Sequence, residues 1–366
     1  MGACCYSEGR RSLSKGDKPE GRGKAPRKIK LAIIGGAQSG KSTLVKQLVR
    51  IHKGDLDPKR RRDYISIIAR NILMSVEKLI SKSEGLGLEE PQLLYAEERG
   101  MDVEVVRAYI EEQKEVAISP RVGKAIERIW GDPGIQACVD IAGQPNYAMN
   151  DSAEYFFENL ERVCNPAYIP SMDDIVIVRC RTAGIYEKSF EFDGCKFTLY
   201  DLGGQKSERK KWNHVLGRND LNGILFLVAV SGYDIPAREN PSISQLEESF
   251  EIFVDFNKTC KEEKRSFILL LNKYDIFYRK IGYRDITCNP LLKNFKFDGK
   301  IPDQKPVRAM EYIEKLFLDS IKKNDTSREW YCHVTNATNE QMITHVFWDV
   351  KDKLFEASLQ ETGLMI

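Results

Sequence analysis

The stretch GGAQSGKS at residues 35–42 decides how this chain folds. It follows the apolar residues Leu31–Ile34 and precedes residues 41–52, where apolar side chains recur at helical spacing. A G-x-x-x-x-G-K-[ST] pattern between a strand and a helix is typical of a loop whose backbone N–H groups surround phosphate oxygens. We expect Lys41 to reach the outer phosphates and Ser42 to ligate Mg²⁺. The loop residues predicted to bind the nucleotide are Gly36, Gln38, Ser39, Gly40, Lys41, Ser42 and Thr43.

The rest of the chain divides into two kinds of pattern. Further strands are predicted at residues 188–192, 196–201, 223–230, 266–272 and 329–334, with helical patterns at 242–257, 307–323 and 339–360. This alternation predicts an α/β fold with a largely parallel sheet. Between the first helix and the strand at 188–192, segments with a helical period at 59–83, 103–114, 121–130 and 152–164 predict an inserted all-helical domain. We therefore expect an arm at 1–27, an α/β domain of 28–56 and 172–366, and a helical domain of 57–171.

Composition excludes several classes of function. The 366 residues carry 56 Lys and Arg against 54 Asp and Glu, so no global field steers the protein to nucleic acid. The longest apolar run, Ile224–Val230, has seven residues, whereas a membrane-spanning helix needs about 18. Nine scattered cysteines without a metal-like CxxC pair favour reduced thiols and a cytoplasmic setting, and they argue against zinc. Four of these are expected in the core, namely Cys138, Cys164, Cys195 and Cys332.

The amino-terminal arm predicts membrane attachment. Residues 1–30 hold nine Lys or Arg and three acids, and Gly2, Cys4 and Cys5 are positioned for acylation. One or two acyl chains together with a basic segment would anchor the protein to an anionic membrane surface, which predicts the cytoplasmic face of the plasma membrane. Tyr6 departs from the myristoylation pattern, which wants Ser or Thr there. The alternative is an unmodified, solvated tail.

Two later motifs complete a guanine-nucleotide site. A predicted strand ends in Asp201, whose carboxylate would hold Mg²⁺ through water, and Gly204 and Gln205 follow, the latter suited to orient an attacking water. Taken alone, an acidic residue at the end of a strand is equally well explained as part of a turn. Residues 272–275 form N-K-x-D after another strand. Asp275 can accept both hydrogens from the N1 and N2 edge of guanine, which adenine does not offer. The residues predicted to serve the base are Asn272, Lys273, Asp275 and, through its backbone N–H, Ala337.

Together these residues resemble the heterotrimeric G-protein alpha subunits over nearly the whole chain after residue 28. The most specific stretch is DLGGQKSERKKW at 201–212, and NDSA at 150–153 and R-x-x-T-x-G at 179–184 also match. The resemblance implies a Ras-like P-loop GTPase domain with an inserted all-helical domain and the nucleotide between them. It also implies GTP hydrolysis to GDP and phosphate with Mg²⁺.

The resemblance assigns further roles. Arg179 is implied as the catalytic partner of Gln205, Thr182 as the second Mg²⁺ ligand, and Asp151, with Ser152 beside it, as a nucleotide-binding residue facing Lys273. A contact of Arg209 with Glu248 is implied as well. The implied partners are a βγ dimer, an effector, a GTPase activator of the RGS type, and a seven-transmembrane receptor that binds the carboxyl-terminal helix.

Three departures from the family pattern suggest alternative functions. Ala37 and Gln38 stand where the family usually has glycine and glutamate, and Ala183 replaces a usual threonine where RGS proteins dock. The methyl of Ala37 is expected to slow hydrolysis, and the missing carboxylate at 38 is expected to speed GDP release. One alternative function is therefore a self-loading or weakly hydrolysing GTP-binding scaffold. A second is an ATP-dependent phosphotransferase, which would have no use for Asp275.

Overall fold

A computed structural model describes residues 27–87, 89–112, 117–140, 149–260, 265–299, 301, 304–322 and 330–361. The amino-terminal arm with Gly2, Cys4 and Cys5 lies outside these residues, so its lipidation stays a prediction. The last residues, Gly363–Ile366, also lie outside them. In the part of the chain that is described, no helix is both long and apolar enough to cross a membrane.

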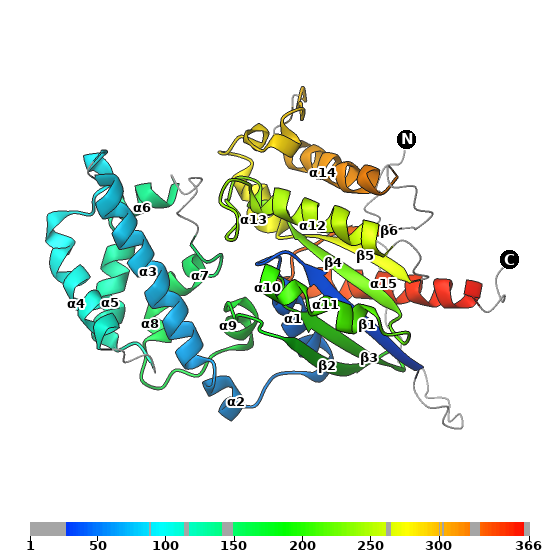
Figure 1. Ribbon diagram of the computed structural model, residues 1–366. Coiled ribbons are helices and arrows are strands. Elements are labelled where there is room, and N and C mark those ends of the chain that lie inside the picture. Colours follow the sequence, from blue (N-terminus) through cyan, green and yellow to red (C-terminus); the bar gives the residue numbers. More distant parts are fainter. Residues whose placement is uncertain are drawn as a thin grey trace.

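A six-stranded sheet carries the site, in the order β2-β3-β1-β4-β5-β6 (Figure 1). Its strands are β1 (Arg27–Gly35), β2 (Ile185–Phe192), β3 (Cys195–Leu202), β4 (Gly223–Ala229), β5 (Ser266–Asn272) and β6 (Trp330–Val334). Only the β2–β3 pair is antiparallel, and the other four pairs are parallel. The carboxyl ends of β1, β3, β4, β5 and β6 therefore meet at one edge, which is where ligands bind in sheets of this kind.

Helices cover both faces of the sheet. Helices α1 (Lys41–Lys53) and α15 (Glu340–Glu361) pack on one face, where Leu48 and Phe347 join the strand residues Ile33 and Leu199 in one core. The other face is covered by α11 (Trp212–Leu216), α12 (Gln245–Thr259), α13 (Tyr274–Lys280) and α14 (Gln304–Lys322). Because both faces are covered, every residue of β4 and β5 is buried, which explains their continuous apolar runs.

The chain between α1 and β2 forms a separate group of helices, seen to the left of the sheet in Figure 1. They are α2 (Pro58–Arg62), α3 (Ile65–Gly87), α4 (Gly100–Glu111), α5 (Pro120–Trp130), α6 (Pro133–Asp140), α7 (Ala153–Phe157) and α8 (Leu160–Val163), followed by α9 (Met172–Ile177). They have their own hydrophobic core, built around residues such as Ile72, Ile126 and Phe156. No strand occurs in the described residues of 57–171. The predicted α/β fold with an inserted helical part is confirmed, while the exact domain boundaries stay a prediction.

Three details of the predicted elements are wrong. The helix predicted over 59–83 is interrupted, because α2 ends at Arg62 and α3 begins at Ile65. Four consecutive basic residues end α2, and the carboxyl end of a helix dipole favours positive charge there. The helix predicted over 152–164 is likewise divided into α7 and α8, and the Asn159 side chain donates to the Tyr155 carbonyl at the break (2.8 Å). Cys332 is only partly buried, whereas Cys138, Cys164 and Cys195 are core residues as predicted.

A buried carboxylate fastens α9 to the helical part of the chain. Asp174 accepts two hydrogen bonds from Arg162 (2.7 and 2.8 Å) and one each from the hydroxyls of Tyr155 (2.8 Å) and Tyr168 (2.9 Å). Its side chain is fully buried. Burial by itself would raise the pKa of Asp174, but the hydrogen bonds from Arg162, the Ser171 backbone and the two tyrosines outweigh it and lower that pKa to about 2. The carboxylate therefore stabilises the fold above its unfolded pKa, and this contribution is lost as pH falls from about 4 through 2.

We expect Asp174→Asn to lower the free energy of unfolding by about 3–5 kcal/mol at neutral pH, because Arg162 loses the anion that pairs with it. The neighbouring Asp173→Asn is the matched control. Asp173 is exposed and pairs with Arg50, so its loss should cost less than about 1 kcal/mol. Urea unfolding followed by circular dichroism measures both variants, and equal costs would contradict the assignment.

Candidate functional site

A cavity of about 400 Å³ opens at the carboxyl edge of the sheet, between the sheet and the helical part of the chain. Most of the site residues predicted from the sequence line it. They are Gln38, Ser39, Gly40, Lys41, Ser42, Thr43, Asp151, Ser152, Arg179, Thr182, Gly204, Gln205, Asn272, Lys273, Asp275 and Ala337. Two predicted residues, Gly36 and Asp201, do not line the cavity, and their contacts with residues that do line it are described below. The fold therefore brings together segments up to about 300 residues apart in the sequence.

The loop after β1 is shaped by its own lysine. Lys41 is buried and its ammonium group donates to the carbonyl oxygens of Gly36 (2.6 Å) and Gly35 (3.0 Å) and to the Ser39 hydroxyl (3.2 Å). Burial lowers the pKa of Lys41 to about 8, so an anion in the cavity would stabilise its charged form. Gly40 has φ +97°, and a Cβ there would meet the Asn272 amide nitrogen at 2.2 Å, so only glycine fits. The loop is thus held in shape by its own lysine, which is cationic at neutral pH.

Oxygen atoms suited to a magnesium ion gather beside the loop. The Ser42 and Thr182 hydroxyls lie 2.5 Å apart, although the two residues are far apart in the sequence. Asp201 is buried behind them, and its Oδ1 has no hydrogen-bond partner. Burial raises the pKa of the Asp201 carboxyl, and a hydrogen bond from Ser42 opposes this rise. A cation would satisfy the orphaned oxygen, and two hydroxyls with one carboxylate are the oxygen donors that Mg²⁺ combines with phosphates. The predicted ligands fit this metal.

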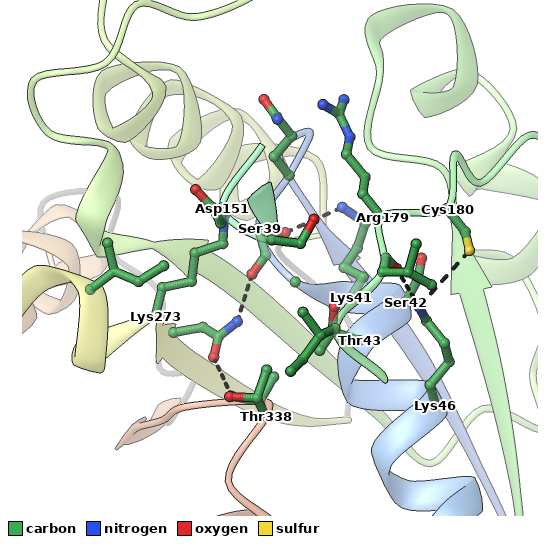
Figure 2. A pocket seen from close by; sticks show the side chains of 18 of the residues that line it. Ser39, Lys41, Ser42, Thr43, Lys46, Asp151, Arg179, Cys180, Lys273 and Thr338 are labelled. Atoms are coloured by element: carbon green, nitrogen blue, oxygen red, sulfur yellow. Dashed lines mark hydrogen bonds and ion pairs between the residues drawn. The ribbon is translucent and has the colours of Figure 1, made fainter. Parts of the chain in front are cut away.

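The motif predicted to recognise the base is attached to the loop at residues 35–42, the predicted phosphate loop. The Asn272 amide donates to the Ser39 carbonyl (2.8 Å), and its oxygen accepts from the Ala337 backbone N–H (3.0 Å). The Ala337 N–H is therefore engaged by Asn272 in this structure, and its predicted contact with the base stays a prediction. Asp275 lies in the first turn of α13, a helix that the sequence patterns did not reveal. Lys273 forms an ion pair with Asp151, which joins the sheet edge to the helical part of the chain (Figure 2).

Arg179 is held by neutral amides. Its guanidinium donates to the Asn150 side-chain oxygen (2.6 Å), Asn150 donates to the Asn71 side chain (3.1 Å), and Asn71 donates back to the Arg179 carbonyl (3.0 Å). Burial lowers the pKa of Arg179, and the nearby charges of Arg238 and Arg181 add to this. Sequence reasoning missed the two asparagines. Asn150 stood in the NDSA match without a role, and no local signal marked Asn71.

Lys46 is a further cavity residue that sequence reasoning missed. It lies on α1, and its ammonium group donates to the carbonyls of Ile175 (2.8 Å) and Val178 (2.7 Å) and contacts the Cys180 sulfur (3.9 Å), as the dashed line in Figure 2 shows. A cation at the last carbonyls of a helix is favourable, so Lys46 fixes the end of α9. It thereby sets the position of the segment that carries Arg179. Its position four residues after Ser42, on the same face of α1, was the available signal.

The segment after β3 packs against α12 as the resemblance implied. Arg209 contacts Glu248 (3.5 Å), but Glu239 is closer (3.1 Å) and also accepts from the Lys206 backbone N–H (2.8 Å). Trp212 donates to the Gly203 carbonyl from its buried indole (2.9 Å). The predicted contact of Arg209 with Glu248 is confirmed, and Glu239 is a second acid that the sequence did not reveal. These bonds fix the residues that follow Gln205.

Gly204 offers a direct test of the site. A Cβ at this position would lie 2.5 Å from the Lys41 ammonium and 2.6 Å from the carbonyl oxygens of both Gly35 and Gly36, so the phosphate loop would have to move. We expect Gly204→Ala to weaken binding of a non-hydrolysable GTP analogue by ~5–150-fold, the equivalent of the ~1–3 kcal/mol typical of overpacking. Gly85→Ala is the control, since a Cβ there meets nothing within 4 Å. Titration with a fluorescent analogue compares the variants, and unchanged affinity in Gly204→Ala would refute the close approach.

A comparison with protein families agrees with this geometry. A family model described as the G-protein alpha subunit matches residues 10–354 of the 366. The match therefore includes every described element of the sheet, the inserted helices and all the residues that line the cavity.

Proposed function

This chain belongs to the G-protein alpha subunit family, and from that premise we propose that it is a GTP-hydrolysing switch that transduces signals from a seven-transmembrane receptor. Membership of the family makes it a GTP-binding signalling subunit. The observation that most supports hydrolysis is that one cavity is lined by the phosphate loop, by Asp275, and by both Arg179 and Gln205. Such a cavity accepts a base at one end and phosphates at the other.

In the proposed mechanism, each cavity residue has one task. Lys41 leaves its carbonyl partners to bind the outer phosphate oxygens, and the loop amides hold the rest of the triphosphate. Gln205 orients a water molecule in line with the terminal phosphoryl group. Arg179 stabilises the charge that develops as the bond to the leaving diphosphate breaks, a role that arginine has in this family in general. Mg²⁺ held by Ser42 and Thr182, with Asp201 behind them, would neutralise phosphate charge.

Asp275 and the Asp151–Lys273 pair complete the proposed site. Asp275 accepts two hydrogen bonds from guanine, which makes the protein selective against adenine nucleotides. The Asp151–Lys273 ion pair bridges the cavity, and it would cover the nucleotide and slow its release. A phosphotransferase that uses ATP has no need of Asp275, so competition between GTP and ATP separates the two functions.

The proposed partners follow from the family. A βγ dimer, an effector and an RGS-type activator would read the segments around Thr182 and Lys206–Trp212, and a receptor would bind the end of α15. Lipidation at Gly2, Cys4 or Cys5 would hold the protein at the cytoplasmic face of the plasma membrane. Ala183 stands where the family's threonine meets RGS proteins, so activation by them is the first of these to test.

The deciding experiment is single-turnover GTP hydrolysis by the purified protein with Mg²⁺, measured beside the rate of GDP release. Hydrolysis faster than release would support a switch gated by a receptor. Release faster than hydrolysis would support the second candidate, a protein that loads itself with GTP and hydrolyses it slowly. Two observations favour that candidate. Ala37 stands at the cavity wall. Among the described residues no carboxylate hydrogen-bonds to Arg179, and Gln38, which replaces the family's glutamate, accepts a hydrogen bond from Gln245 instead (3.4 Å). GTP binding without any hydrolysis would refute the proposal that the protein is a GTPase.

A further inference from the structure

A hydrogen bond joins the two segments that carry the catalytic pair. The Arg181 guanidinium donates to the side-chain oxygen of Gln205 at 2.7 Å. We propose that Arg181 is a positioning residue that holds Gln205 out of its catalytic arrangement, so that hydrolysis requires this hydrogen bond to break. The proposal rests on the proposed function and concerns the regulation of the same site.

The chemistry of the glutamine side chain supports this assignment. Its amide group has one oxygen, which accepts, and one nitrogen, which only donates. To orient a water molecule for attack, Gln205 must accept a hydrogen from that water through the same oxygen, which has two lone pairs, one of which Arg181 engages. A guanidinium is a stronger donor than water because its hydrogen bonds are charge-assisted. Arg181 therefore fixes the direction in which the Gln205 side chain points, and the side chain must leave this contact to turn its oxygen toward the reacting water.

The surrounding contacts keep the two side chains opposed. Gln205 precedes α10 (Lys206–Arg209), yet its side chain makes no capping hydrogen bond to that helix, so Arg181 is the partner that orients it. The Gly184 backbone N–H donates to Glu208 (2.8 Å), and Lys211 pairs with the same carboxylate (2.8 Å). The bond from Gly184 to Glu208 holds the two segments together without Arg181, and Lys211 keeps the Glu208 carboxylate in place. Removal of Arg181 thus frees Gln205 without separating the segments.

Two effects of losing Arg181 oppose each other, and their sizes decide the outcome. The first is the loss of a positive charge near the phosphates, which would slow hydrolysis. Arg181 is exposed, so water and salt screen its charge and this effect is small. The second is the release of Gln205. It removes a charge-assisted hydrogen bond, and the free energy of such a bond corresponds to about a tenfold change in rate. Faster hydrolysis is therefore expected.

The test is a double-mutant cycle in single-turnover GTP hydrolysis by the full chain. We expect Arg181→Ala to hydrolyse GTP about tenfold faster than the wild type. In a Gln205→Ala background, the same Arg181→Ala change should have no effect, because there is no side chain left to release. Lys188→Ala is the matched control: it removes an exposed cation from the adjoining strand β2 and should leave the rate unchanged.

Each result has one meaning. A rate in Arg181→Ala that equals or falls below the wild-type rate would overturn the proposal, and so would an acceleration that persists without Gln205 or appears equally in Lys188→Ala. Urea unfolding of the single variants verifies that a rate change is not a loss of folded protein. The proposed function fails separately, if the wild type binds GTP but neither it nor any variant hydrolyses it.

Discussion

Arg179→Ala is expected to slow single-turnover GTP hydrolysis by ~10³-fold or more, a magnitude that belongs to the arginines of this class of GTPase in general. The loss falls on the rate and not on nucleotide affinity, because the arginine acts on charge that develops only in the transition state. In the described structure its guanidinium is held by Asn150 and by no carboxylate, so it is available to an incoming phosphate. The measurement is phosphate release after mixing preloaded protein with Mg²⁺.

Arg279→Ala is the matched control for that variant. Arg279 lines the same cavity but pairs with Glu154 at 3.5 Å, and both side chains are largely exposed. Its removal should change hydrolysis less than about threefold, as expected for a screened surface pair. If both arginine variants slowed equally, the effect would be a general loss of positive potential, and the specific role of Arg179 would be rejected.

Asp275→Asn is expected to exchange the preferred base, lowering affinity for GTP by at least ~10²-fold and raising affinity for xanthosine triphosphate. Guanine presents two donors to the aspartate, whereas xanthine presents one donor and one acceptor. A carboxylate accepts from both donors of guanine. An asparagine side chain matches xanthine, because its oxygen accepts from the donor and its NH₂ group donates to the acceptor. The experiment is a competition titration of both nucleotides against a fluorescent analogue.

The control for this exchange is Asp285→Asn, the same chemical change outside the cavity. Asp285 accepts from the Thr287 backbone and hydroxyl in a local turn, so its replacement should leave base preference unchanged. Weaker binding of every nucleotide in Asp275→Asn, without a gain for xanthosine triphosphate, would mean that α13 had been disturbed and would contradict a direct contact with the base.

Much of the site was predictable because short motifs carry their chemistry in adjacent residues. The loop at 35–42 has glycine at two of its three positions with positive φ, Gly35 and Gly40, and a lysine as the first residue of the helix, and both features are local. The same holds for Asn272 and Asp275 at the end of β5. Strand positions followed from apolar runs, since β4 and β5 are buried on both faces.

Other contacts were not predictable because their partners are distant in the sequence and carry no pattern of their own. Asn71 on α3 reaches the Arg179 carbonyl across 108 positions, and Lys46 reaches Val178 across 132. Short helices such as α9 and α13 were also missed, since a single turn or two gives too few residues to show a period. Tertiary contacts decide whether such segments become helical.

The sequence by itself determined the kind of ligand and the kind of fold. Backbone conformation at glycines, a lysine after the loop and an aspartate after a strand are local requirements, and they specify phosphate and guanine wherever the chain folds. Only the tertiary structure decided which side chains hold the two residues proposed for catalysis, namely Asn150 for Arg179 and Arg181 for Gln205. The physical reason is that a hydrogen bond needs two groups within about 3 Å, and that proximity is set by the packing of α1, α3 and the sheet, not by neighbours in the chain.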